Sequence, residues 1–431
     1  MRAKRIVYLI VAAIGCACAP ARADLLSYVA RPEPEFRWEK KSETPLGELK
    51  VTDLYLCSQV WKGIKWEHTV RVMSPPKVEY PNAMVLMITG GNPGPQELML
   101  GSMVANALGA RFAVLYNIPN QPLFGGLSED DLIAHTYMEY MKSGDEEWPL
   151  LFPMAKSAVK AMDALQAFSE QEWGQKIDTF VVTGASKRGW TTWLTGIADP
   201  RVKGIAPIVY DNLNIPAQMP YQLKTWGKYS EQIDDYTRRG LQQQLNTPLG
   251  RKLVRMVDPY SYLPRLKMPK LIINATNDRY WTLDALNLYF SDLPGDNWIL
   301  YVPNQPHGIQ DAARVVAAEA AFFRHVAGGQ QMPRMRWTYG RWKGGLTMRL
   351  ESDPQPKSAK LWIARSATRD FRESKWEASP MQARGAAFVA VVDPPKKGSI
   401  AFFAEPQFDI GGKTFTLSTS VRILPEMRPA R

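Results

Sequence analysis

Cysteine and histidine are scarce in this sequence. Only 3 cysteines and 4 histidines occur among 431 residues, and two of the cysteines, Cys16 and Cys18, fall within the first 23 residues. Without them Cys57 has no partner for an internal disulfide. The motif H-E-x-x-H and the paired Cys/His motifs of zinc sites are absent. We therefore expect neither a disulfide framework nor a metal centre.

The signatures of cofactor and nucleic-acid binding are also missing. No G-x-G-x-x-G follows a first strand, and no G-x-x-x-x-G-K-[ST] loop is present, so no cofactor is expected. The net charge is +11, but the basic residues are scattered and form no arm or stripe. Nucleic acid is therefore not an expected partner, while a weak preference for anionic substrates or surfaces stays open. Internal repeats and low-complexity segments are absent.

Long apolar segments are missing too, apart from one at the N-terminus. Residues 6–19 form an apolar run that follows three basic residues and precedes Ala21-Arg22-Ala23, an A-x-A cleavage site. The run is shorter than the ~20 residues that span a bilayer. We predict a signal peptide over residues 1–23, a secreted or periplasmic protein and no transmembrane segment. Lipid attachment at Cys16 is a less favoured alternative, because the residues before it fit poorly.

The remaining chain has the composition of a globular protein, with 45% hydrophobic and 22% charged residues. Short alternating runs between residues 50 and 72 predict antiparallel strands. Continuous apolar runs at 83–88, 112–118 and 205–210 suit strands that are buried on both faces. Helical spacing appears between them at 97–108 and 147–173. Strands that alternate with helices predict an α/β fold with a mostly parallel sheet and helices on both faces.

Two changes in pattern divide the chain. From about residue 212 to 266 no buried strand is visible, and Trp226 and Tyr229 stand among polar residues, which predicts a helical cap insertion. A Gly/Gln/Pro-rich break at 328–333 is followed by five short runs of alternating polarity, typical of a β-sandwich. We therefore expect a domain over 24–330 that carries the cap, and a C-terminal β-sandwich domain over 331–431.

Residues 178–190 are the most informative segment. A β-branched run ends in Gly184-Ala185-Ser186, and a helix-compatible stretch follows at once. This is the pattern of a nucleophile elbow, a sharp strand-to-helix turn that presents a serine above a parallel sheet.

Two further candidate catalytic residues each follow a later predicted strand. Asp278 comes after the apolar run 271–275, and His307 comes after the run 298–302. A serine needs a base to take its proton, and the base needs a third group to fix its tautomer. The order Ser186, Asp278, His307 is that of α/β-hydrolases, so the pattern predicts this fold and this triad. The other three histidines fit structural roles better.

The acid has two competitors. Asp211 ends the strand at 205–210, where some hydrolases place their acid, and Asp284 falls at a probable helix start, where it could be an N-cap. We favour Asp278 over both.

Oxyanion stabilisation requires preset donors. The backbone N–H of Lys187 and that of Gly91, in the Gly-Gly-Asn loop after residue 88, are the candidates. Arg188 departs from the usual G-x-S-x-G, and its side chain needs a route to an acid or to a substrate carboxylate. Trp281, together with Tyr280 and the cap aromatics, could line an apolar or sugar-binding pocket or could pack the cap onto the body.

Several ordered segments resemble the PhoPQ-activated pathogenicity-related family of exported α/β-hydrolase-like proteins. They are SQVW (58–61), ITGGN (88–92), IPNQPL (118–123), WPLLFPM (148–154), GASKRGW (184–190), VYDNLN (209–214), NQPH (304–307) and FFAE (402–405). The resemblance covers nearly the whole chain after the leader. It implies the hydrolase fold with a C-terminal β domain, and it supplies no agreed substrate.

A narrower similarity is confined to the turn. Gly184, Ser186, Lys187 and Gly189 resemble the Gly-x-Ser-basic-x-Gly of glucuronoyl and related carbohydrate esterases. It implies ester chemistry with Lys187 as a cationic helper beside the oxyanion, whereas a solvent-facing lysine is the alternative.

Together these features predict an exported serine hydrolase that cleaves an ester or amide through an acyl-enzyme. The expected partners are a small-molecule, sugar-ester or short-peptide substrate, and no oligomeric state is assigned. One alternative is a peptidase of the same fold. Another is a catalytically lapsed scaffold that acts as a binding or signalling protein.

Overall fold

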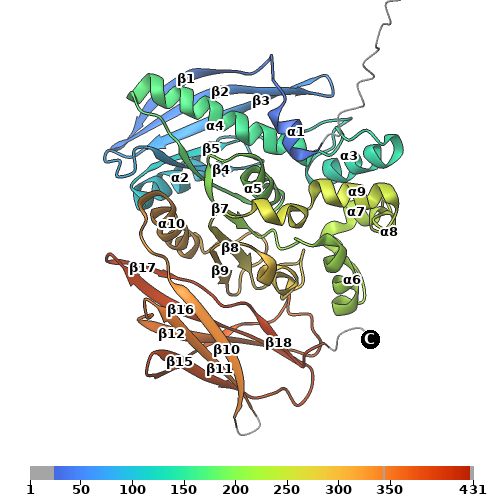
Figure 1. The fold of residues 1–431 in the computed structure, drawn as a ribbon, viewed down its shortest axis with the longest axis vertical. Helices are drawn as coiled ribbons and strands as arrows, with labels where there is room; N and C mark the ends of the chain where they lie inside the picture. The colour runs from blue at the N-terminus through green and yellow to red at the C-terminus, as the bar shows by residue number, and fades with distance from the viewer. Residues whose placement is uncertain (1–23, 343–344, 428–431) are drawn as a thin grey trace, which may run out of the picture.

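The computed structural model describes residues 24–342 and 345–427 of the chain. The signal peptide expected over residues 1–23 and the alternative lipid site at Cys16 lie outside these residues. One mixed sheet forms the centre of the larger part of the molecule, and two antiparallel sheets follow at the C-terminal end, at the bottom of Figure 1. No helix of the described part is long and apolar enough to cross a membrane.

The central sheet has nine strands in the order β1-β2-β3-β5-β4-β6-β7-β8-β9. The first three strands and the pair β3–β5 are antiparallel, whereas β5, β4, β6, β7, β8 and β9 run parallel. Because parallel strands end at the same edge, the loops after β4, β6, β8 and β9 meet there. The bounds are β1 (Arg37–Leu46), β2 (Leu49–Trp61), β3 (Ile64–Ser74), β4 (Ala83–Ile88), β5 (Arg111–Leu115), β6 (Thr179–Ala185), β7 (Val202–Ile208), β8 (Lys270–Ala275) and β9 (Asn297–Val302).

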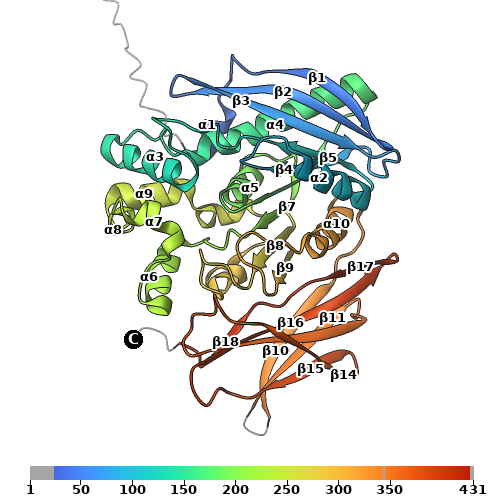
Figure 2. The ribbon, with the colours of Figure 1, turned by 180° about the vertical axis from the view of Figure 1, so that it is seen from behind.

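Helices cover both faces of this sheet. The parallel strands are nearly all apolar, and all six residues of β8 are buried, as expected for strands packed on two sides. On one face lie α2 (Pro95–Leu108) and α10 (Ala312–Gly328), and on the other lie α4 (Leu151–Trp173) and α5 (Lys187–Ala198), with α1 (Leu25–Ala30) against α4. Figures 1 and 2 show these helical layers on the two faces of the sheet. The buried side chains form a separate hydrophobic core on each face.

The chain between β7 and β8 is helical. It forms α6 (Ile215–Trp226), α7 (Asp234–Thr237), α8 (Leu241–Gln244) and α9 (Pro248–Val257), with 3₁₀ turns at Glu231–Ile233 and Pro259–Arg265. These helices gather beside α3 (Glu129–Ser143), on the right of Figure 1. In α9 the apolar residues Leu253, Val254 and Val257 recur on one buried side, which is why this short helix packs against the body. The helical stretch lies between Ile208 and Lys270, and the cap insertion over about residues 212–266 stays a prediction.

The last hundred residues form two packed antiparallel sheets. One has the order β10-β11-β15-β14, and the other β13-β12-β16-β17 with β18 beside β16. Buried Met348, Leu350, Leu361 and Phe402 fill the space between them. The bounds are β10 (Arg334–Trp342), β11 (Gly345–Asp353), β12 (Ser358–Ser366), β13 (Glu377–Pro380), β14 (Gln382–Arg384), β15 (Ala387–Val392), β16 (Ser399–Ile410), β17 (Lys413–Thr416) and β18 (Arg422–Leu424). The predicted fold class, an α/β-hydrolase-type sheet followed by antiparallel sheets, is confirmed.

The helix α3 is the main element that the sequence patterns do not predict, beyond a helix-like stretch around His135. Its buried residues alternate with acids and other polar residues, so the apolar stripe is weak. The helix begins after Ser128 with Glu129, Asp130 and Asp131 in its first turn, where carboxylates favour the helix dipole.

Candidate active site

Ser186 occupies the sharp turn between β6 and α5. Its backbone has φ 59° and ψ −126°, a region that non-glycine residues adopt only under constraint. Its N–H donates to the carbonyl oxygen of Ile208 at 2.8 Å, which fastens the turn to β7. Since α5 starts at Lys187, the serine lies at the positive end of a helix, where backbone N–H groups have no partner within the helix. This is the geometry of a nucleophile elbow.

Two glycines permit the turn. A Cβ on Gly184 would lie 2.8 Å from the carbonyl oxygen of Arg188, and a Cβ on Gly189 would lie 2.9 Å from that of Ile208. Both distances are too short for any side chain. The close approach that the usual motif assigns to its second glycine is therefore made one position later, by Gly189, and the side chain of Arg188 leaves in another direction.

The guanidinium of Arg188 passes beneath the loop that follows β4. A Cβ on Gly90 would lie only 1.7 Å from one of its nitrogens, so glycine is required there. Arg188 Nε donates to the carbonyl oxygen of Ile118 at 2.6 Å, and its two terminal nitrogens each donate to Glu129 at 2.7 Å. The expected route out for this cation thus leads to an acid. Arg188 is absent from the lining of the cavity beside Ser186, and its proposed contact with substrate stays a prediction.

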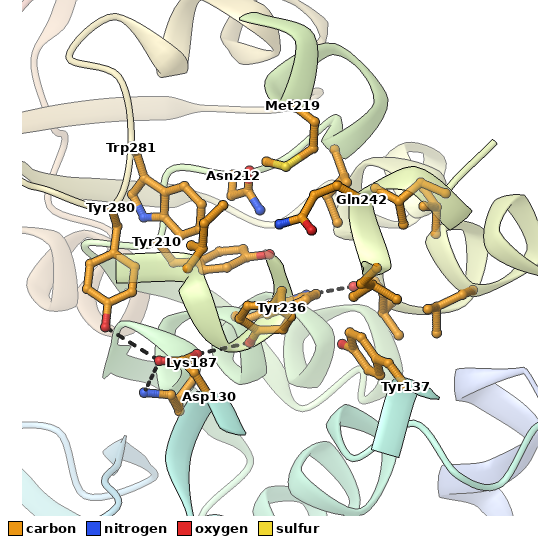
Figure 3. A pocket seen from close by; sticks show the side chains of 18 of the residues that line it. Asp130, Tyr137, Lys187, Tyr210, Asn212, Met219, Tyr236, Gln242, Tyr280 and Trp281 are labelled. Atoms are coloured by element: carbon orange, nitrogen blue, oxygen red, sulfur yellow. Dashed lines mark hydrogen bonds and ion pairs between the residues drawn. The ribbon is translucent and has the colours of Figure 1, made fainter. Parts of the chain in front are cut away.

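Lys187 is paired as well. Its Nζ lies 2.7 Å from Glu129 and 3.0 Å from Asp130, and its side chain is only 7% exposed, so it does not face solvent. Asp130 also accepts hydrogen bonds from the hydroxyls of Tyr236, at 2.9 Å, and Tyr280, at 3.4 Å (Figure 3). Two cations, two carboxylates and two phenols therefore form one cluster directly below the nucleophile.

Glu129 is held in place from several sides. Its backbone has φ 55°, its N–H donates to Gln121 at 2.8 Å, and the amide of Gln121 donates back to its carboxylate at 2.5 Å. Burial alone would raise the pKa of Glu129, but the hydrogen bonds and charges of Arg188 and then Lys187 outweigh it and hold the pKa well below its usual range. Glu129 is therefore ionised at neutral pH. Sequence reasoning missed this residue and Asp130, although three acids after a serine are a signal of a helix start.

His307 and Asp278 meet at the carboxyl edge of the sheet. The distance from His307 Nδ1 to Asp278 Oδ2 is 2.8 Å, and the other carboxylate oxygen of Asp278 accepts the N–H of Tyr280 at 2.8 Å. Nδ1 therefore carries the proton, which leaves Nε2 as the basic nitrogen. Nε2 is buried and makes no hydrogen bond within the described part of the chain.

Ser186 and His307 come to the same edge but do not share a hydrogen bond within the described residues. The ring of Tyr280 stacks on the imidazole with a centroid distance of 4.1 Å, and Tyr280 also lines the cavity that Ser186 lines. Hydrogen bonds of catalytic groups are often long or misaligned before a substrate binds. The structure thus joins acid to base, and it places the serine nearby without closing the triad.

The competing acids have other partners. Asp211 is 4% exposed and accepts hydrogen bonds from Asn274 Nδ2 at 2.9 Å and from the hydroxyl of Tyr289 at 2.8 Å. Burial raises the pKa of Asp211 to about 8. Asp284 lies 2.8 Å from the guanidinium of Arg369. Of the three candidates, only Asp278 contacts His307.

The two expected oxyanion donors come from different elements, the first turn of α5 and the loop after β4. The N–H of Lys187 belongs to the first turn of α5. Gly91 is exposed, its carbonyl accepts the N–H of Asn117 at 3.0 Å, and a Cβ placed on it would meet no atom within 4 Å. Open space therefore adjoins Gly91, and its role as an oxyanion donor remains a prediction.

A largely apolar cavity of about 80 Å³ lies beside Ser186 and Lys187, beneath the helices that follow β7. Figure 3 shows Trp281 and Tyr210 on one wall and Tyr137 on another. Four buried polar atoms of its lining make no hydrogen bond within the described residues, namely the hydroxyls of Tyr137 and Tyr210 and the amide oxygens of Asn212 and Gln242. The cavity thus combines apolar walls with groups ready to donate and accept hydrogen bonds.

The aromatic residues expected around this cavity divide into two groups. Tyr280 and Trp281 line it. Trp226 instead lies under the guanidinium of Arg372, 4.2 Å from its ring centroid, and Tyr229 packs against the core without lining the cavity. The cap aromatics of α6 and the following turn therefore serve packing.

The segment 369–376 of the C-terminal part braces the acid and base loops. Asn277 Nδ2 donates to the carbonyl oxygens of Arg372 at 3.1 Å and Ser374 at 2.8 Å. Asn304 and Trp376 exchange two hydrogen bonds, at 3.0 and 2.7 Å. Since Asn277 precedes Asp278 directly and Asn304 lies three residues before His307, the β sheets help to position both side chains.

The other histidines lie away from this site. His68 is buried against Ser58 and two backbone carbonyls, and burial lowers its pKa to about 4, so it is neutral. His325 binds the carbonyl oxygen of Gln330. Across residues 24–342 and 345–427, no group of three or more His, Cys, Asp or Glu side chains is arranged to hold a metal ion.

Comparison with known proteins assigns this chain to a family. The model of the "PhoPQ-activated pathogenicity-related protein" family matches residues 25–372. The chain belongs to this family. It is also 31% identical over 372 residues to "Autocrine proliferation repressor protein A" of Dictyostelium discoideum, covering 80% of this chain and 75% of that protein.

Solved structures that match this chain include two esterases and one other hydrolase. An acetyl xylan esterase from Paenibacillus sp. R4 has a TM-score of 0.46 at 13% identity and covers 70% of this chain and 92% of its own. An S-formylglutathione hydrolase from Agrobacterium tumefaciens has a TM-score of 0.45 at 15% identity, covering 67% and 100%. A glucuronoyl esterase from Solibacter usitatus has a TM-score of 0.43 at 13% identity, covering 69% and 90%.

The raised pKa of Asp211 predicts a pH dependence of stability. The folded state binds this proton between the ordinary pKa of about 4 and the raised value, so the contribution of Asp211 to stability is lost as the pH rises through that window. We expect the free energy of unfolding of Asp211→Asn to improve relative to wild type by up to ~1.4 kcal/mol per pH unit. Urea unfolding at pH 5, 6, 7 and 8 measures the free energy of unfolding of both proteins. A difference between them that is the same at every pH would contradict the prediction.

Proposed function

We propose that this member of the family is an exported serine hydrolase that cleaves an ester or amide through an acyl-enzyme. Ser186 attacks the carbonyl carbon, His307 takes the serine proton and later gives it to the leaving group, and Asp278 holds the imidazole in the required tautomer. The backbone N–H groups of Lys187 and Gly91 bind the oxyanion. The contact of 2.8 Å between His307 Nδ1 and Asp278 carries the proposal, because it leaves Nε2 basic and unpartnered at the edge where the serine lies.

The cluster below the elbow supports this proposal. Arg188 stands at a position of the elbow that normally packs tightly, and a large side chain there would favour lapsed catalysis if it displaced the serine. Arg188 is accommodated without displacing the serine, since Gly189 makes the close approach and Glu129 neutralises the guanidinium. Lys187 is fixed by Glu129 and Asp130, and it lines the same cavity as Ser186.

The substrate is proposed to be a small molecule. The cavity beside Ser186 holds about 80 Å³, which is less than the 150 Å³ of an engineered cavity that binds benzene. Such a space takes a short acyl group, and the unpartnered hydroxyls and amide oxygens of its lining favour one that makes hydrogen bonds. An ester with a short acyl group fits these limits, and a sugar ester or a short peptide is the alternative.

A binding or signalling role is the second candidate. It is favoured by the similarity to a relative named as a repressor of proliferation, and by the missing hydrogen bond between Ser186 and His307. An inactive scaffold would keep the fold and the ion cluster but would not react with an electrophile at Ser186.

Labelling by a fluorophosphonate probe separates the two candidates. We expect the wild-type protein to be labelled and Ser186→Ala to be unlabelled, because only an activated serine attacks the phosphorus at a useful rate. His307→Ala should lose at least about 10³-fold in labelling rate. Gel fluorescence and intact mass measure both effects. A folded wild-type protein that stays unlabelled would favour the binding role.

The identity of the acid is tested by a matched pair of substitutions. Asp278→Asn should lower kcat by about 10⁴-fold, because the amide stabilises the wrong tautomer of His307. Asp211→Asn removes another buried carboxyl group and should leave kcat within about tenfold of wild type, since Asp211 does not contact the imidazole. Hydrolysis of a p-nitrophenyl acetate substrate measures both. The reverse ranking would assign the acid to Asp211.

The hydrogen bonds between Asn277 and segment 369–376 predict that a substitution of Asn277 lowers kcat. Asn277→Ala removes both hydrogen bonds to segment 369–376 and should lower kcat by about 10- to 100-fold with little change in KM, because small displacements of catalytic groups are costly. Asn287→Ala is the control, since Asn287 binds the carbonyl oxygen of Val421 away from His307. Equal kcat values in the two variants would show that the contact does not position Asp278.

A further inference from the structure

A second cavity lies on the opposite side of the serine from the cap. It has a volume of about 270 Å³, and it runs between α2 and α10 along the carboxyl ends of the central strands. Its lining includes Ala185, directly before the nucleophile, Thr89 of the loop after β4, and His307. We call it the α2–α10 groove. Its volume exceeds the 150 Å³ of a cavity that takes benzene, so it is large enough for an organic group.

The floor of the groove is unusual for the middle of a sheet. Met87 on β4 and Ile208 on β7 are only half-buried, although both strands are central and parallel. Side chains at such positions are normally covered by a helix, because protein interiors are close-packed. Here α2 and α10 leave them accessible. The groove is therefore a gap in the packing that begins at the active-site edge.

The walls are apolar and nearly uncharged. Leu100 and Val104 come from α2, and Val315 and Val316 come from α10. The one acid deep in the groove is Glu319. Burial raises its pKa to about 7, so it is largely neutral below that pH, and its carboxyl lies 2.8 Å from the hydroxyl of Thr183. The other acid of the lining, Glu97, is exposed at the outer end.

The two cavities contact different members of the proposed triad. The cavity beneath the cap is lined by Ser186 and Lys187, whereas the α2–α10 groove is lined by His307 and not by Ser186. In the proposed reaction the acyl group becomes bonded to Ser186 Oγ, while the leaving oxygen takes its proton from His307 Nε2. The acyl group must therefore lie on the side of the serine and the leaving group on the side of the imidazole.

From this division we propose that the α2–α10 groove binds the leaving group, and that this group is an apolar alcohol. The proposal rests on the hydrolase function given above. His307 protonates the alkoxide as the bond from the carbonyl carbon to the leaving oxygen breaks, and the free alcohol departs along the groove. Water then attacks the acyl-enzyme, gives a proton to His307, and releases a short acid from the cap side with Ser186 reprotonated.

The test uses two matched series of esters. Along acetates of straight-chain alcohols from ethanol to hexanol, kcat/KM should rise by about three- to fourfold per methylene, which is the value of burying a CH₂ group. Along ethyl esters from acetate to hexanoate, kcat/KM should fall, because the cap-side cavity is small. If kcat/KM stays constant along the acetates, the assignment is wrong. It is also wrong if kcat/KM falls along the acetates and rises along the ethyl esters.

One variant fills the groove and a second controls for the change of residue. Val316→Phe places a larger side chain in the lining and should reduce the preference for hexyl over ethyl acetate at least tenfold. Ala313→Phe, at an exposed position of the same helix, should keep the preference. Equal preferences in the two variants would contradict the proposal, and thermal unfolding verifies that both are folded.

Binding without turnover separates this proposal from the hydrolase function. Calorimetric titration of 1-hexanol into the Ser186→Ala variant should show binding. The same titration into the double variant Ser186→Ala/Val316→Phe should show none. If the fluorophosphonate labels Ser186 in wild type while hexanol does not bind, the groove proposal fails alone. If the label fails and hexanol binds, the hydrolase function fails, and the leaving-group assignment falls with it.

Discussion

The pairing of Lys187 and Arg188 with Glu129 and Asp130 is the constraint on which the site depends. Two cations directly after the serine lie at the positive end of α5, so without acids they would repel each other and the helix dipole. The acids come from the first turn of α3, and Gln121 and the carbonyl of Ile118 hold Glu129 and Arg188 from the other side. This single cluster fixes the position of α3 relative to the elbow.

The same cluster reaches the elements that surround the substrate site. Asp130 binds Tyr236 of the cap and Tyr280 of the loop that carries Asp278. Tyr280 in turn stacks on His307. A chain of contacts thus runs from the nucleophile turn through two carboxylates to the base. Segment 369–376 adds to this chain from outside, because its backbone carbonyls accept hydrogen bonds from Asn277, next to Asp278, and from Asn304, three residues before His307. The appended sheets are therefore part of the frame of the site.

Asymmetry around the serine gives this site its proposed selectivity. The helices after β7 close over one side and leave a small cavity with polar groups, whereas α2 and α10 leave a larger apolar groove on the other side. A substrate with a short acyl group and an apolar alcohol matches both spaces. The neutral form of Glu319 is consistent with this division, since an ionised carboxylate would disfavour an apolar group in the groove.

The sequence by itself was enough to predict the fold class and the order of the proposed catalytic residues along the chain. The β-branched run before Ser186, the apolar strands before Asp278 and His307, and the glycines at 184 and 189 are local patterns, and each reports the geometry of its own turn or strand. They sufficed to predict the α/β fold, the antiparallel sheets after it and the meeting of Asp278 with His307, which parallel strands bring to one edge.

Only the tertiary structure decided which distant charges meet and where space remains. Nothing local relates Glu129 to Arg188 or Asn277 to Ser374, because these contacts join segments that are far apart in the chain. The same holds for Trp226, whose aromatic ring packs against Arg372 instead of lining a pocket. The α2–α10 groove could not be predicted either, since a gap arises from how two helices sit on a sheet, and each helix alone is an ordinary apolar segment.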